Sequence, residues 1–223
     1  RYKISLEEFA RKNVNEYSSF NDFFTREFDE GVRPIDQTEN TIVSPVDGKI
    51  MESGRVSDGK LFQLKNMEYN LNHLLNNNPK LIEAFKNASY VTIYLAPYNY
   101  HRVHLPYQGK ILGNQIIGGM AYKVNEQALK KINALYTKNT RQISQFESSK
   151  VNFCMIMVGA MNVSSISITD KNKDVYNKGE EFARFNLGST VLMLFSGSES
   201  IKFPDHLKFG EKIKLGECIA KFR

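Results

Sequence analysis

The apolar residues of this chain recur at two different spacings, and each spacing predicts a different kind of element. In the first thirty residues they recur three and four positions apart, as on one face of a helix. These positions are Leu6, Phe9, Ala10, Phe20, Phe23 and Phe24. Ser19 is a suitable N-cap for the second group, and Pro34 ends the region. We therefore expect a helical N-terminal segment.

Most of the remaining apolar positions predict strands. Strands are expected where β-branched and aromatic residues alternate or run together: 42–53 around a turn, 90–95, 153–168 as one or two buried strands, and 191–195. Short helices are expected at 71–75, 81–85 and 125–135. The pattern indicates an α+β fold with a β-rich core of antiparallel or mixed hairpins, similar to a barrel-sandwich, with peripheral helices.

A short repeat supports the hairpin interpretation. The segments Pro45-Val46-Asp47-Gly48-Lys49-Ile50 and Pro106-Tyr107-Gln108-Gly109-Lys110-Ile111 share the pattern Pro-x-x-Gly-Lys-Ile, and Gly210-Glu211-Lys212-Ile213 is a weaker match. Each reads as a turn that leads into a strand. The first copy carries Asp47 where the second carries Gln108. A carboxylate there is either an Asx-turn residue or a buried acid that orients another side chain.

Composition narrows the classes of function. The chain has 223 residues, 41% hydrophobic and 24% charged, which is typical of a globular protein with a substantial core. Its apolar runs are far shorter than the roughly 20 residues that cross a bilayer. The net charge of +6 suits an anionic partner such as a lipid surface. We expect no nucleic-acid binding, because no basic cluster is interleaved with aromatic residues.

The two cysteines, Cys154 and Cys218, are isolated in the sequence and predict buried thiols rather than a disulfide or metal site.

The segment Leu187-Gly188-Ser189-Thr190 stands directly before an apolar run that ends at Phe195. A Gly-Ser pair is usually a turn, but this one lies at the mouth of a predicted buried strand. A serine held there, after a residue without a Cβ, is placed to attack the carbonyl of its own preceding peptide.

Two of the four histidines, His101 and His104, lie close together between Pro97 and Pro106. Their spacing places them on one face only if the backbone bends between them. Acid/base chemistry, a structural role and metal binding remain as alternatives, although no third metal ligand has suitable spacing. His73 and His206 look ordinary. Asp47, His104 and Ser189 are a sufficient set for activating a hydroxyl, but spacing alone does not show that they meet.

Six segments, spread along nearly the whole chain, resemble the phosphatidylserine decarboxylase family. They are Asn21-Asp22-Phe23-Phe24-Thr25-Arg26, Val32-Arg33-Pro34-Ile35, Ser44-Pro45-Val46-Asp47-Gly48, Tyr100-His101-Arg102-Val103-His104, Val158-Gly159-Ala160-Met161-Asn162-Val163 and Phe185-Asn186-Leu187-Gly188-Ser189-Thr190. The last resembles the Leu-Gly-Ser-Thr maturation site of the family. Ser164 departs from the glycine that is usual there, without affecting a proposed catalytic residue.

The resemblance implies that the chain cleaves itself between Gly188 and Ser189, giving a β chain of residues 1–188 and an α chain of residues 189–223. Asp47, His104 and Ser189 would drive this cleavage. Ser189 would become a covalent pyruvoyl group that forms a Schiff base with substrate, so no metal and no pyridoxal phosphate are expected. His101 would bind substrate, and the reaction would convert phosphatidylserine to phosphatidylethanolamine and CO2.

The resemblance also implies a domain organisation, a location at a membrane and a second copy of the chain as partner. We expect residues 1–33 to form a membrane-proximal helical segment and 34–223 the catalytic domain. The enzyme would be a homodimer attached peripherally to anionic lipid, on the cytoplasmic face of a bacterial inner membrane rather than in a mitochondrion or plastid. Two alternatives remain: a pyruvoyl decarboxylase of a soluble amino acid, and a carrier or binding module with a fold like biotinyl and lipoyl domains.

Overall fold

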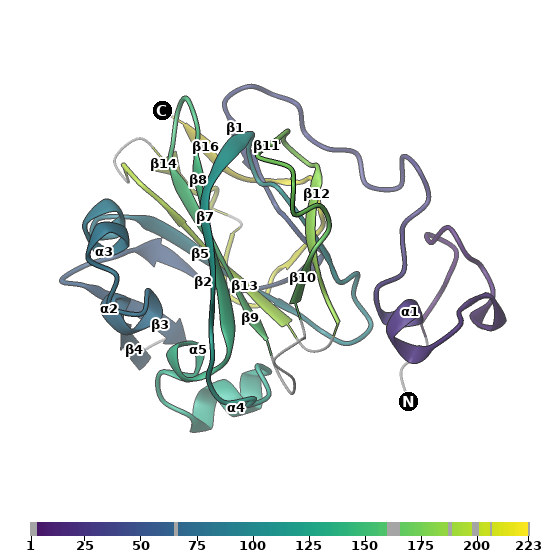
Figure 1. Ribbon diagram of the computed structural model, residues 1–223, viewed down its shortest axis with the longest axis horizontal. Helices are drawn as coiled ribbons and strands as arrows, with labels where there is room; N and C mark the ends of the chain where they lie inside the picture. Colours follow the sequence, from purple (N-terminus) through teal and green to yellow (C-terminus); the bar gives the residue numbers. More distant parts are fainter. Residues whose placement is uncertain are drawn as a thin grey trace.

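The computed structural model describes residues 4–64, 67–159, 166–186, 189–197, 201–205 and 207–222, and its centre is an eight-stranded antiparallel sheet. The strand order is β11-β7-β8-β9-β13-β5-β2-β15 (Figure 1). In chain order these strands are β2 (Gly48–Arg55), β5 (Ser89–Leu95), β7 (Gly109–Ile117), β8 (Arg141–Glu147), β9 (Phe153–Gly159), β11 (Val175–Tyr176), β13 (Ser189–Phe195) and β15 (Lys212–Ile213).

Strand β13 lies in the interior of this sheet and is buried on both faces. Its Val191, Met193 and Phe195 belong to one hydrophobic cluster, and its Leu192 and Leu194 to a second. Successive side chains of a strand point to opposite faces, so an uninterrupted apolar run fits only a strand that is covered on both sides. The run expected at 191–195 is therefore confirmed as a central strand.

Two small sheets pack against the first cluster. One has the order β1-β16-β14 and the other β10-β12-β6, and Ile42, Ile219, Val103 and Phe182 are their buried contributions. The strands are β1 (Thr41–Val43), β6 (Arg102–His104), β10 (Ile166–Ile168), β12 (Glu181–Phe185), β14 (Ile201–Lys202) and β16 (Cys218–Phe222).

Helices and a hairpin cover the second cluster on the opposite face, at the left and bottom of Figure 1. They are β3 (Lys60–Leu64), β4 (Met67–Asn70), α2 (Leu71–Leu74), α3 (Pro79–Phe85), α4 (Glu126–Lys131) and α5 (Leu135–Lys138). The expected α+β class with a β-rich antiparallel core is confirmed. Both strong copies of the repeat also lead into strands, because β2 begins at Gly48 and β7 at Gly109.

The helix expected over residues 125–135 is wrong in its second half, where the chain breaks between α4 and α5. Ile132 is extended, and Ala134 adopts a left-handed conformation with φ of 54°. The buried side chain of Gln63 makes the break favourable. Its amide donates to the carbonyl of Ile132 at 2.8 Å, and its oxygen accepts from the N–H of Leu135 at 2.6 Å. A distant side chain therefore satisfies the groups that a continuous helix would pair internally.

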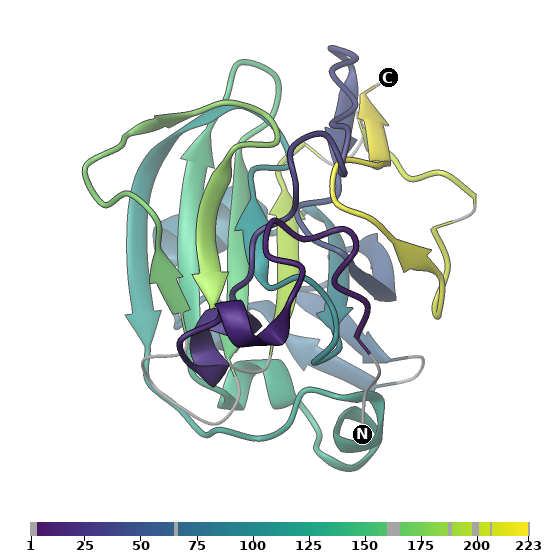
Figure 2. The same cartoon turned by 90° about the vertical axis from the view of Figure 1, so that its right-hand side faces the viewer.

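The N-terminal segment, residues 4–33, lies across the body near β6 and β12 (Figure 2) and is less helical than expected. A helix is confirmed as α1 (Phe20–Phe24), capped by the hydroxyl of Ser19, and a single 3-10 turn is formed by Val14–Glu16. The helix expected around residues 6–10 is wrong. Phe9 forms a β-bridge with Phe28 and stacks on its ring at 4.8 Å, so this tertiary pairing replaces the helix.

Candidate active site

Ser189 stands at the head of β13, between two antiparallel neighbours. Its Cα is in register with Leu95 of β5 and with Gly159 of β9. The residue is 0% exposed, and its hydroxyl has no hydrogen-bond partner among the described residues. Leu187 and Gly188 lie outside the described residues. A buried hydroxyl without a partner is uncommon, and one at a suspected reaction centre is a candidate nucleophile.

His101 immediately precedes β6 and is fully buried. Its Nδ1 lies 2.9 Å from the carbonyl of Asn99, which only accepts, so Nδ1 carries the proton and Nε2 is a bare acceptor. That Nε2 has no partner in the described part of the chain. Burial lowers the pKa of His101 to about 3, so the ring is neutral at physiological pH. The N–H of Phe185 donates to the His101 carbonyl at 2.9 Å, which ties this histidine to the strand that leads towards Ser189.

His104 lies at the other end of β6 and has a partner on each ring nitrogen. Nδ1 is 2.9 Å from the carbonyl of Gly179, and Nε2 is 3.0 Å from the hydroxyl of Tyr100. The carbonyl only accepts, so Nδ1 donates to it and Nε2 accepts from Tyr100. Burial lowers the pKa of His104. The two histidines are therefore both neutral bases protonated on Nδ1. Among the described residues, Nε2 of His104 has a partner and Nε2 of His101 has none.

Asp47 lies in the turn between β1 and β2, close to His104 along the backbone, because the N–H of His104 donates to the carbonyl of Pro45 at 2.9 Å. Its carboxylate does not bond to the histidine. Arg33 donates to it through Nε at 3.0 Å and Nη2 at 2.7 Å, and the N–H of Leu215 donates at 2.8 Å. Asp47 acts on His104 through space, where its charge opposes the effect of burial on the histidine pKa.

The structure therefore brings Asp47 and His104 to neighbouring positions but does not join them to Ser189 by hydrogen bonds. His101 and Ser189 are buried, and each has a polar side-chain atom without a partner in the part of the chain that the structure describes. Sequence reasoning missed Tyr100, Arg33 and Gly179 as partners of the site. Tyr100 and Arg33 lie within the matched motifs, which was an available signal, whereas nothing local marks Gly179.

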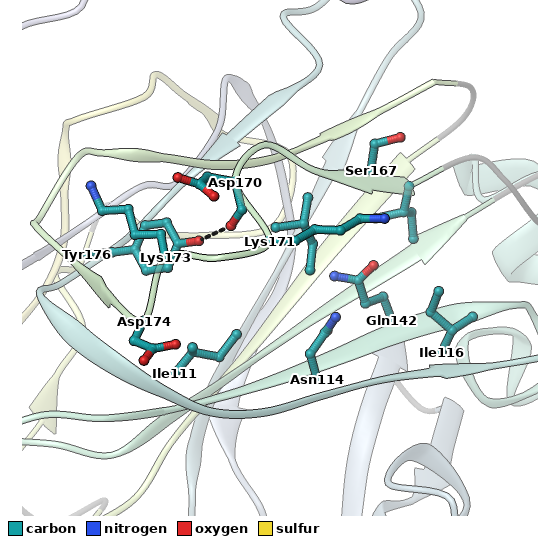
Figure 3. A pocket seen from close by; sticks show the side chains of 12 residues that line it. Ile111, Asn114, Ile116, Gln142, Ser167, Asp170, Lys171, Lys173, Asp174 and Tyr176 are labelled. Carbon is teal, nitrogen blue, oxygen red and sulfur yellow. Dashed lines mark hydrogen bonds between the residues drawn. The ribbon is translucent and has the colours of Figure 1, made fainter.

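Two open cavities flank the Tyr100 ring. One of about 250 Å³ is lined by Asp47, Arg33 and Tyr100 among others, and one of about 350 Å³ is lined by His104, Gly179 and Tyr100 among others. Tyr100 lines both cavities, whereas His104 lines only the second. A separate cavity of about 440 Å³ lies between β7, β8 and the segment from β10 to β11 (Figure 3). It contains none of the predicted site residues.

The described residues were also compared with the requirements of a metal site and of a membrane-spanning helix. Within the described ranges, no group of three or more His, Cys, Asp or Glu side chains has a geometry suited to a metal ion. None of the helices in those ranges is long and apolar enough to cross a bilayer. His73 lies exposed in α2, as expected for an ordinary residue, whereas His206 and Ser164 fall outside the described residues.

The fold and these side chains define an enzyme-like centre in a β-rich protein, with a buried serine at a strand head and two neutral histidines on a neighbouring sheet. Comparison with known proteins identifies its family. The family model for phosphatidylserine decarboxylase matches residues 20–221. A phosphatidylserine decarboxylase proenzyme of Psychrobacter arcticus is 34% identical, with 98% of this chain and 83% of the relative covered. One of Shewanella amazonensis is 35% identical, with 99% and 84% covered.

The chain belongs to the phosphatidylserine decarboxylase family. The resemblance predicted from its motifs is confirmed, as is its assignment to an enzyme of the carboxy-lyase class. This assignment disfavours both alternatives, the soluble amino-acid decarboxylase and the carrier module.

Proposed function

We propose that this chain is a proenzyme that cleaves its own Gly188–Ser189 bond, converts Ser189 to a pyruvoyl group, and then converts phosphatidylserine to phosphatidylethanolamine and CO2. The observation that carries the proposal is the buried hydroxyl of Ser189, at the head of a central strand, which has no hydrogen-bond partner among the residues the structure describes. The surroundings of Ser189 fit a covalent ketone made from the chain, because strands on both sides hold its backbone.

In the proposed cleavage, Ser189 Oγ attacks the carbonyl of Gly188, and the peptide C–N bond breaks to leave an ester and a free amine. His104 takes the hydroxyl proton on Nε2, and the charge of Asp47 stabilises the imidazolium. The imidazolium then gives that proton to the departing nitrogen, which completes the amine. Loss of the Cα proton of residue 189 and departure of the Gly188 carboxylate give dehydroalanine. One water then replaces the nitrogen, which leaves as ammonia. Tyr100 must release Nε2 for this transfer, since it donates to that atom at 3.0 Å.

A pyruvoyl group supplies a ketone carbonyl that withdraws electrons from an amine substrate and so favours the loss of CO2. In the proposed reaction His101 binds the substrate through Nε2, a buried acceptor that has no partner within the described ranges. His104 returns a proton to the substrate carbon. Neither role needs a metal ion or pyridoxal phosphate.

The two products of cleavage are proposed to remain together as β and α chains. The α chain of residues 189–223 begins with β13, which pairs along its whole length with both β5 and β9. Its β16 pairs with β1 of the other chain. Separation would break these hydrogen bonds and expose both hydrophobic clusters to water.

We also propose peripheral attachment to anionic lipid, on the cytoplasmic face of a bacterial inner membrane, through the N-terminal segment, and a homodimeric enzyme. Phe20 and Val14 of that segment are 68% and 59% exposed and supply the apolar contact. The basic charge comes from residues 34–223, which hold 24 Lys and Arg against 17 Asp and Glu. Exposed apolar side chains together with basic charge are typical of interfacial binding. Equal binding to neutral and anionic vesicles at every salt concentration would contradict the electrostatic part.

The intact mass under denaturing conditions tests the central proposal. Active protein should give two fragments, and the one of residues 189–223 should have a blocked N-terminus that reacts with hydroxylamine or borohydride. Ser189→Ala should remain one inactive chain, whereas Ser57→Ala, at an exposed turn, should mature normally. A single full-length species from active protein would refute self-cleavage. Turnover of free serine in place of phosphatidylserine vesicles would instead support the soluble-substrate alternative.

A further inference from the structure

The N-terminal segment contacts the strand that carries the two histidines at several points. The ring of Phe24 lies 3.8 Å, centroid to centroid, from the ring of His101. The side chain of Arg102 turns outward and donates to the carbonyl of Thr25 at 2.9 Å, and it pairs with Glu27 at 2.6 Å. Residues 24–28 therefore lie along the His101–His104 strand. A segment expected to serve the membrane is built into the wall of the site.

Phe28 continues this contact and fixes the ring of Tyr100. The two rings are stacked with centroids 4.1 Å apart, and the ring of Phe9 is also stacked with that of Phe28 at 4.8 Å. The hydroxyl of the same Tyr100 donates to Nε2 of His104. Stacked rings thus connect the N-terminal segment to His104. Because a tyrosine ring is rigid, fixing its plane also fixes the direction of its hydroxyl.

Arg33, at the end of the same segment, fixes Asp47. The guanidinium forms a bidentate pair with the carboxylate, and the side chains of Arg33 and Asp47 are only 8% and 11% exposed. Arg33 is itself held by the exposed carboxylate of Glu8 at 2.8 Å and by the ring of Phe28, which its guanidinium covers at 4.2 Å. A planar fork of this kind sets both the charge balance and the orientation of a carboxylate.

We propose that residues 24–33 are part of the maturation centre, in which Arg33 is a positioning residue for Asp47 and Phe28 is a positioning residue for the Tyr100–His104 pair. This inference rests on the proposed self-cleavage by Asp47, His104 and Ser189. It goes beyond that mechanism because it assigns to the N-terminal segment a role in the chemistry that is separate from membrane attachment.

The physical reason is geometric. Proton transfer from Ser189 requires His104 to present Nε2 in one orientation, with Asp47 close enough to stabilise the charged ring. Arg33 and Phe28 touch neither Ser189 nor the imidazole through any described hydrogen bond, so they act through Asp47 and Tyr100. A displacement of about 1 Å in such a site costs on the order of a hundredfold in rate.

The test is the rate of self-cleavage of the full chain, followed after cell-free synthesis without lipid by intact mass. We expect Arg33→Ala to slow maturation by about tenfold to a hundredfold. Arg33→Lys should recover part of the rate, because lysine restores the positive charge but cannot form the bidentate pair with Asp47. Phe28→Ala should be slow, and Phe28→Tyr, which keeps the stack, should mature at close to the normal rate.

Matched controls change the same residue types at other positions. Arg11 also forms a bidentate pair with an aspartate, Asp22, at 2.8 and 2.5 Å. Phe62 is an aromatic residue of β3 with an exposed ring. Arg11→Ala and Phe62→Ala should mature at the normal rate without lipid. A further control measures maturation of the parent chain in enough urea to give it the same free energy of unfolding as Arg33→Ala. If the parent still matures faster than Arg33→Ala, the slow maturation of the variant does not come from lower stability.

The outcomes distinguish failure of the positioning roles of Arg33 and Phe28 from failure of the proposed self-cleavage. If Asp47→Asn and His104→Ala block maturation while Arg33→Ala and Phe28→Ala mature at the parent rate, this inference is wrong and the proposed function stands. If Asp47→Asn and His104→Ala mature normally, the proposed function itself fails. The proposal would also be overturned if the urea-treated parent matured as slowly as Arg33→Ala and Arg33→Lys recovered none of the rate. Arg33 would then affect maturation only through stability.

Discussion

The hydroxyl of Tyr100 donates to Nε2 of His104 at 3.0 Å, while the carbonyl of Gly179 accepts from Nδ1 of the same ring. The pair of contacts selects one tautomer and holds the imidazole in one plane. It also occupies the nitrogen that a serine hydroxyl would use. His104 is therefore in the tautomer that the proposed cleavage needs, but its Nε2 already accepts a hydrogen bond from Tyr100. The proposed cleavage requires the Tyr100 hydroxyl to leave Nε2 and the Ser189 hydroxyl to take its place.

Removing the Tyr100 hydroxyl should lower stability measurably. In Tyr100→Phe the stacked ring is kept, but Nε2 of His104 loses its donor in a buried setting. An unsatisfied buried acceptor costs about 1–3 kcal/mol, so we expect a loss of that size in the free energy of unfolding. Urea titration in the uncleaved Ser189→Ala background measures it. The control Tyr122→Phe changes a more exposed ring and should stay within about 0.5 kcal/mol of the parent.

The buried ring of His101 should make stability depend on pH. Its pKa is lowered from 6.5 to about 3 by burial, so below pH 6.5 the unfolded chain takes up a proton that the native chain does not. The stabilisation is complete above pH 6.5 and is lost as the pH falls towards 3. This site should contribute a loss of about 2 kcal/mol between pH 7.5 and 5. The stability of His101→Gln, measured by urea titration, should depend less on pH by that amount.

Alanine should be more destabilising at Gly179 than at Gly31, a second glycine with the same backbone conformation. Gly179 has φ of +77° and Gly31 has φ of +79°, so alanine at either position is strained by about 1–2 kcal/mol. A Cβ on Gly179 would lie 2.6 Å from Cγ1 of Ile35, whereas a Cβ on Gly31 meets nothing within 4 Å. We expect Gly179→Ala to lose a further 1–3 kcal/mol, roughly the cost of overpacking.

The same pair of glycine variants also tests the site. The displaced carbonyl of Gly179 would no longer hold Nδ1 of His104, so maturation of Gly179→Ala should be slower than that of Gly31→Ala. Intact mass after cell-free synthesis reports both rates. Equal maturation of the two variants would show that the carbonyl of Gly179 is not needed to orient His104.

The interior position of β13 predicts a large cost for truncating its side chains. Met193 is fully buried between neighbouring strands, and Met193→Ala should lower the free energy of unfolding by about 2–5 kcal/mol. Val175 is exposed on the edge strand β11, so Val175→Ala should change it by less than about 0.5 kcal/mol. Urea titrations of both variants in the Ser189→Ala background provide the comparison. Similar values for the two would contradict a central β13.

Several features of this protein follow from local sequence. The run after Ser189 predicts a strand covered on both faces, and β13 is one. The repeated Pro-x-x-Gly-Lys-Ile pattern predicts turns that feed strands, and β2 and β7 begin at its glycines. The helices that failed did so for tertiary reasons: Phe9 pairs with Phe28 in place of a helical turn, and Gln63 supports the break near Ile132.

By itself, the sequence determined the family, the candidate serine and histidines, and the buried strand that follows Ser189, because motifs and hydrophobic periodicity are local properties. Only the tertiary structure decided the partners of those side chains. Arg33 reaches Asp47 and Gly179 reaches His104 across many intervening residues, and Tyr100 takes the nitrogen expected for Ser189. Such choices depend on which strands pack together, since hydrogen bonds form between groups that folding brings within about 3 Å.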